Sequence, residues 1–100
     1  AKTEVITSYN VAARVPGKKR PDETIIYTAH HDHLGIGLPD ANGDRIYNGA
    51  IDNSTGISHL LEQARAFARS RRTDRSVVFL AVGAEEKGLL GSQYYAEHPL

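Results

Sequence analysis

A helical pattern lies between two short apolar runs, and this arrangement leaves few folds open to the chain. From Ile57 to Ala68, apolar residues recur at three- and four-residue spacing, which predicts an amphipathic helix that begins near Ser54. Residues 24–29 and 76–82 flank it and are apolar without alternation, as in strands buried on both faces. A strand, a helix and a second strand in this order predict a right-handed crossover with parallel strands.

The other segments complete an α/β pattern. Residues 3–15 alternate between apolar and polar side chains, which predicts a half-buried strand at a sheet edge or beside an antiparallel partner. Residues 16–22 hold two prolines and three consecutive cations, which indicates a solvated turn. Residues 35–49 are rich in glycine and predict a loop with a tight turn at Asn42–Gly43, and residues 89–97 predict a short helix. We therefore predict an α/β fold with an open, mixed sheet.

Composition excludes several classes of function. A chain of 100 residues forms one small domain or a fragment of a larger one. Lys plus Arg, at 12, equal Asp plus Glu, at 12, so no net charge favours nucleic acid or an anionic membrane as a partner. No apolar stretch approaches the roughly 20 residues needed to cross a bilayer. Because the chain has no cysteine, any metal must be held by histidine and carboxylate side chains.

Ionisable residues follow both predicted parallel strands. His30 and Asp32 come directly after the first strand, and Glu85 and Glu86 come after the second. Asp52 stands at the entry to the crossover helix. Because sites in open α/β sheets form beyond the carboxyl ends of parallel strands, we expect these five side chains at one edge of the sheet.

Imidazole and carboxylate groups together suit a hydrolytic metal site. They are ligands of zinc and related ions, and one carboxylate can bridge two ions. Of two adjacent glutamates, one can bind metal while its neighbour takes a proton from the attacking water. The spacing of His30 and Asp32 lets the aspartate hydrogen-bond the ring nitrogen that faces away from the metal. Each motif alone has a plainer interpretation, namely a surface histidine, a solvated pair of glutamates and a helix cap near Asp52; their coincidence favours the metal site.

Three strings in the chain also carry a resemblance. Residues 29–35 (AHHDHLG), 48–56 (NGAIDNSTG) and 79–92 (FLAVGAEEKGLLGS) resemble, in order and spacing, the di-zinc aminopeptidase family. That family includes glutamate carboxypeptidase, aminopeptidase Y, glutaminyl cyclases and the transferrin receptor. The resemblance covers nearly the whole chain from about residue 9. It implies a three-layer sandwich around the open mixed sheet.

The resemblance implies a role for each candidate residue. His30 would bind one of two Zn²⁺ ions, Asp52 would bridge both, and Glu86 would bind the second. Glu85 would be the general base, and Asp32 would orient His30.

The resemblance also concerns the residues around these groups. Gly49 and Gly56 would allow close backbone approach around Asp52, and the peptide bond after Asp52 would be cis. His31 and His33 have no ligand role in the family pattern, so we place them at the pocket rim or in solvent.

Two ligands that the family pattern requires are absent. The pattern needs a further Asp and a further His after Glu86, but the chain has no Asp there and its only His is His98, in a different context. We therefore expect residues 1–100 to be a single partial zinc-peptidase catalytic domain, its N-terminal part, inactive by itself and with weakened metal affinity. An exposed apolar strand edge predicts self-association of this piece.

The expected function of the parent protein is that of a zinc metallo-aminopeptidase that hydrolyses N-terminal residues of peptides through a two-zinc site. Two alternatives stay open: a non-catalytic structural or binding member of the same fold, and a glutaminyl-cyclase-like acyltransferase. The expected partner is a peptide substrate, with neither nucleic acid nor membrane. Since relatives are commonly exported, the parent is expected to be secreted or periplasmic.

Overall fold

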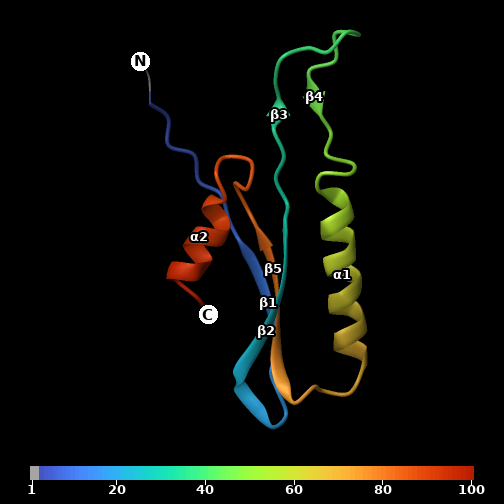
Figure 1. Ribbon diagram of the computed structural model, residues 1–100, viewed down its shortest axis with the longest axis vertical. Coiled ribbons are helices and arrows are strands. Elements are labelled where there is room, and N and C mark those ends of the chain that lie inside the picture. Colours follow the sequence, from blue (N-terminus) through green and yellow to red (C-terminus); the bar gives the residue numbers. More distant parts are fainter. Residues whose placement is uncertain (1–2) are drawn as a thin grey trace.

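A three-stranded mixed sheet forms the centre of the fold in the computed structural model, which describes residues 3–100 (Figure 1). The strand order is β1-β5-β2, with β1 antiparallel and β2 parallel to the central β5. The helix α1 connects β2 to β5, so the predicted crossover with parallel strands is confirmed. The bounds are Val11–Val15 for β1, Arg20–His30 for β2, Ser54–Arg69 for α1 and Arg75–Val82 for β5.

The core lies on both faces of β5, whose side chains alternate between two helices. On one face Leu60, Val77 and Phe79 form a buried cluster to which Phe67 of α1 also packs. On the other face Val78, Leu80 and Val82 are buried, and Tyr95 packs on them from α2, Leu90–Glu97. Figure 1 shows the two helices on opposite sides of the sheet, so the three-layer, open mixed α/β architecture is confirmed.

The start of α1 is set by a side-chain cap. The side-chain oxygen of Asn53 accepts a hydrogen bond from the backbone N–H of Gly56 at 3.1 Å, which satisfies one free donor of the first turn. A Cβ on residue 56 would lie 2.5 Å from the Asn53 side chain, so only glycine fits beside this cap. The predicted helix start near Ser54 is therefore confirmed.

The first strand is shorter than predicted. Only Val11–Val15 pair with β5, and residues 3–10 have no strand partner. The alternation of residues 3–15 continues in the sequence, but Val11 already pairs with Ala81, next to the last residue of β5. The prediction of an edge strand with an antiparallel partner is therefore confirmed for Val11–Val15, and it was wrong for residues 3–10, because pairing ends where the partner strand ends.

The second strand is longer and more exposed than predicted. It begins at Arg20, so the predicted turn at residues 16–22 ends at residue 19. Ile25 and Ile26 are 44% and 46% exposed, so the expectation of burial on both faces was wrong. The reason is topological: β2 is the outer strand of the sheet among the described residues, while β5 occupies the centre.

The glycine-rich segment forms an extension beyond the sheet. Two short strands, β3 (Gly35–Ile36) and β4 (Ile46–Tyr47), pair as an antiparallel hairpin that projects past the end of α1 (Figure 1). Its tip is closed by the carboxylate of Asp40, which accepts the backbone N–H groups of Asn42 and Asp44. The predicted turn is present at this tip, whereas the two short strands were predicted as loop. None of the helices in residues 3–100 is long and apolar enough to cross a membrane.

Candidate metal centre

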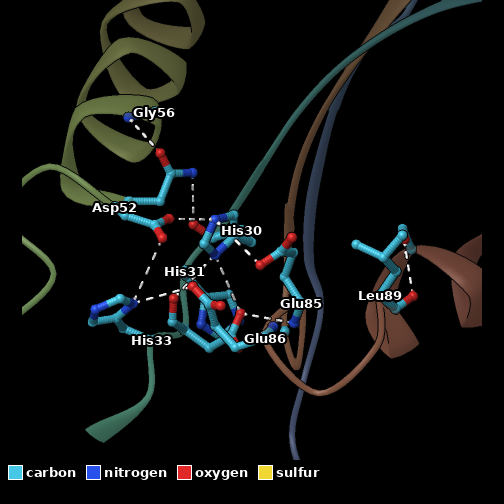
Figure 2. A network of polar contacts seen from close by, with 12 residues as sticks. His30, His31, His33, Asp52, Gly56, Glu85, Glu86 and Leu89 are labelled. Atoms are coloured by element: carbon cyan, nitrogen blue, oxygen red, sulfur yellow. Dashed lines mark hydrogen bonds and ion pairs between the residues drawn. The ribbon is translucent and has the colours of Figure 1, made fainter. Parts of the chain in front are cut away.

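Three segments that are distant in sequence meet at the carboxyl edge of the sheet. His30, the last residue of β2, pairs with Val82, the last residue of β5. The loops that leave the two strands therefore start side by side, and the N-terminus of α1 lies at the same edge (Figures 1 and 2). The topology brings together all five predicted site residues: His30, Asp32, Asp52, Glu85 and Glu86.

Three of these side chains form a donor set for a cation. One ligating atom each from His30, Asp52 and Glu86 lies within 4.8 Å of the other two. Donors that share one tetrahedral zinc ion at about 2.0–2.1 Å lie roughly 3.3 Å apart, and Nε2 of His30 is 3.0 Å from Oδ1 of Asp52. An imidazole and two carboxylates without a thiolate are suitable donors for zinc and for related divalent ions. The residues present therefore fit a metal of this kind.

The ring of His30 is held with Nε2 toward the carboxylates. Its Nδ1 donates a hydrogen bond to the backbone carbonyl of Asp32 at 3.0 Å, which leaves Nε2 facing Asp52 and, at 3.7 Å, Glu85. A neutral imidazole nitrogen without a proton repels carboxylates at this range, so a proton or a cation belongs between them.

The surrounding negative charges also favour a positive charge at His30. Burial by itself lowers the pKa of His30. The hydrogen bond to the Asp32 carbonyl and the negative charges of Glu85, Asp52 and Asp32 outweigh burial, and the pKa is raised above its ordinary value. The pocket around Nε2 thus favours positive charge, whether a proton or a metal ion supplies it.

Asp32 links the two loops that carry the site. Its Oδ1 accepts the backbone N–H of Glu85 at 3.0 Å, and its Oδ2 accepts that of Glu86 at 3.3 Å. Burial raises the pKa of Asp32, but these hydrogen bonds and the charge of His30 outweigh it, and the pKa is lowered. The carboxylate lies 3.5 Å from Nδ1 of His30, so it is close to the ring, but Nδ1 donates its hydrogen bond to the backbone carbonyl of Asp32 and not, as predicted, to the carboxylate. The carboxylate instead holds the backbone of both glutamates.

The backbone around Asp52 has the features that the resemblance implies. The Asp52–Asn53 peptide bond is cis. Gly49 has a positive φ of 72°, and a Cβ there would lie 3.0 Å from the carbonyl oxygen of Asp52. The amide of Asn53 donates to the backbone carbonyl of His30 at 3.1 Å, which ties the start of α1 to the end of β2.

Two contacts of the site were missed by the sequence analysis. His33, predicted at the rim, places Nδ1 3.1 Å from Oε1 of Glu86 (Figure 2). Asn10 bridges the loop of the glutamates: its side chain accepts from the N–H of Gly83 and donates to the carbonyl of Gly91. A hydrogen bond between residues 53 or more positions apart leaves no periodic signal, so neither contact could be derived from spacing. His31 lies on the exposed side and donates to the backbone carbonyl of Tyr9.

Comparison with known protein families shows to which family the chain belongs. Residues 10–100 match the model of peptidase family M28. The chain belongs to this family. The residues that converge at the sheet edge all lie inside the matched range, in agreement with the resemblance of the three strings to di-zinc aminopeptidases.

Individual relatives support the same conclusion. The chain is 39% identical over 93 residues to aminopeptidase YwaD of Bacillus subtilis, a match that covers 92% of the chain and 18% of the relative. It is 36% identical over 88 residues to a probable zinc metalloprotease of Pyricularia oryzae, covering 88% and 17%. A solved structure of BSAP, a zinc aminopeptidase from Bacillus subtilis, superposes with a TM-score of 0.71 at 33% identity and covers 91% of the chain. The chain spans a fifth or less of the lengths of these three proteins.

Proposed function

We propose that the chain is the metal-binding part of a zinc aminopeptidase catalytic domain, with a peptide as its substrate. The observation that carries the proposal is the convergence of His30, Asp52 and Glu86 within 4.8 Å, beside the carboxylate of Glu85. The names of the relatives, which are zinc metalloproteases and aminopeptidases, support the same chemistry. Their greater length supports residues 1–100 as one partial domain that lacks the further Asp and His ligands.

His30, Asp52 and Glu86 are the residues that would hold the metal. The side chain of Asp52 is 58% exposed, with Oδ1 3.0 Å from Nε2 of His30 and Oδ2 3.9 Å from Nδ1 of His33, the ring that also contacts Glu86. Its two oxygens thus face different neighbours, which supports a bridging role between two ions. Bound zinc supplies Lewis acidity, which polarises a carbonyl and lowers the pKa of water.

Glu85 is placed for proton transfer. Its Oε2 lies 3.7 Å from Nε2 of His30, and its side chain is 33% exposed, so it faces both the metal-binding groups and solvent. The N–H of Glu85 is held by Asp32, which fixes the backbone from which the carboxylate extends. In this position Glu85 takes the proton of the attacking water and passes it to the departing amine.

A Glu85→Gln substitution tests this proposal in the complete catalytic domain. Hydrolysis of a peptide with a free N-terminus should fall by at least about 10²-fold, because general-base catalysis is lost, while zinc content is unchanged. A peptide with an acetylated N-terminus tests the aminopeptidase assignment and should resist the wild-type enzyme. Unchanged turnover in the variant would contradict the role of Glu85, and equal cleavage of both peptides would contradict an aminopeptidase.

A further inference from the structure

His33 contacts a proposed metal ligand directly. Its Nδ1 lies 3.1 Å from Oε1 of Glu86 and 3.9 Å from Oδ2 of Asp52. The contact is shielded, since the side chains of His33 and Glu86 are only 22% and 19% exposed. Figure 2 shows the ring on the side of the cluster opposite Glu85. A neutral imidazole that donates from Nδ1 satisfies one carboxylate oxygen and leaves the other free.

The side chain of His33 is held in place by its neighbours from the β3–β4 hairpin and from the segment before Asp52. Tyr47 of β4 presents its ring at 69° to that of His33, with centroids 6.1 Å apart. A Cβ on Gly49 would lie 3.4 Å from the Cβ of His33, so the chain before Asp52 passes close to this side chain. The hairpin and the Asp52 loop therefore restrict the rotamers of His33, which reduces the entropy cost of its hydrogen bond to Glu86.

The geometry favours positioning over direct ligation. The donors close enough to share one ion in the described part of the chain are His30, Asp52 and Glu86, and His33 is outside that set. Glu86 is instead held at both ends, by Asp32 at its backbone N–H and by His33 at its carboxylate. Carboxylates that bind metal are themselves commonly hydrogen-bonded, and loss of such a partner typically lowers metal affinity 10–100-fold.

We propose that His33 is a positioning residue that orients the carboxylate of Glu86 for metal binding through a hydrogen bond from Nδ1. This inference rests on the proposed function, in which Glu86 is a metal ligand. It extends that proposal by giving the β3–β4 hairpin a role, because Tyr47 of β4 packs against the ring.

The test compares two substitutions of His33 in the 100-residue chain, with Zn²⁺ titrated by calorimetry. In His33→Asn, the amide nitrogen takes the place of Nδ1 and can still donate to Glu86, so most of the zinc affinity should remain. In His33→Leu, the donor is lost and affinity should fall about 10–100-fold. His31→Leu is the matched control from the same loop, since His31 contacts only the Tyr9 carbonyl among the polar groups described, and its affinity should stay at the wild-type value.

A second measurement needs no metal. The ¹⁵N shifts of the His33 ring in the metal-free chain, at a pH where the ring is neutral, should show the proton on Nδ1, and Glu86→Leu should remove this preference. Equal loss of zinc affinity in both His33 variants would overturn the proposal in favour of direct ligation, and so would no loss in either. If the wild-type chain binds no zinc, the metal-site proposal fails for this chain. In that case the tautomer of the His33 ring still tests the hydrogen bond to Glu86, and a proton on Nε2 would show that this bond is not formed.

Discussion

At the scale of single residues, Asp32 has more contacts than its predicted role required. The sequence placed it two residues after His30, and this spacing predicted a contact with the ring. The structure adds two hydrogen bonds from the backbone N–H groups of Glu85 and Glu86, 53 and 54 residues away. The same carboxylate therefore sets the position of a proposed ligand and of the proposed base.

Asp32→Asn should destabilise the chain by about 1–3 kcal/mol at neutral pH, because an amide has one acceptor oxygen where the carboxylate has two, and one of the partly buried N–H groups of Glu85 and Glu86 then loses its acceptor. Urea unfolding followed by circular dichroism measures the difference. Since the pKa of Asp32 is lowered in the folded state, its contribution is complete above its ordinary pKa and is lost as pH falls through the lowered value. The difference in free energy of unfolding between the wild-type chain and Asp32→Asn should therefore become smaller at acid pH. A larger difference at acid pH would contradict the stabilising role of the ionised Asp32.

At the scale of elements, the parts predicted best are those whose own side chains determine their packing. The helix α1 starts at Ser54 and β5 runs from Arg75 to Val82, as their patterns indicate, because one carries an apolar stripe and the other is covered on both faces. The sequence could not show where the pairing of β1 stops, or that β2 is an outer strand without a second neighbouring strand among the described residues. Both properties depend on the arrangement of the strands and not on the local pattern. The β3–β4 hairpin was missed because each of its strands has only two residues.

The site, too, has a part that the sequence predicts and a part that it does not. The five candidate residues could be placed at one edge because topology alone delivers the ends of parallel strands there. Their orientation could not be predicted. The contacts from His33 to Glu86 and from Asn10 to Gly83 depend on loop conformations, which side-chain periodicity does not encode.

Gly56→Ala tests the N-terminal cap of α1, because the cap determines whether this substitution stabilises or destabilises the chain. In an open helix this change stabilises by about 0.5–1 kcal/mol. Here the new Cβ would lie 2.5 Å from the Asn53 side chain, which holds both the cap and a hydrogen bond to the His30 carbonyl. We therefore expect a loss of about 1 kcal/mol, the typical value of an N-cap, in thermal or urea unfolding. A more stable variant would show that the cap is not formed.

At the scale of the whole molecule, the chain is unusually extended. Its radius of gyration is 16.7 Å, whereas a compact domain of 100 residues has about 13 Å. The β3–β4 hairpin projects from one end (Figure 1), and the outer edge of β2 has no strand partner among residues 3–100. Ile25 and Ile26 are partly exposed on this strand. Such an edge favours pairing with another chain.

We accordingly expect the isolated chain to self-associate through β2. Sedimentation velocity over a concentration series should show species larger than the monomer. Ile26→Lys should shift the distribution toward monomer, because a charge on an exposed edge strand opposes pairing. Ser58→Lys, on the exposed surface of α1, is the control that adds the same charge elsewhere. A strictly monomeric wild-type chain would refute self-association.

The most direct test of the metal centre is calorimetric titration of Zn²⁺ into the 100-residue chain and into its His30→Ala variant, with His59→Ala on α1 as the control. If His30, Asp52 and Glu86 form the site, the wild-type chain and the control should bind zinc with the same affinity, and the His30 variant should lose that binding. Affinity should be lower than in a site with all its ligands. Equal binding by all three chains, or no binding by the wild type, would contradict a metal centre at this edge of the sheet.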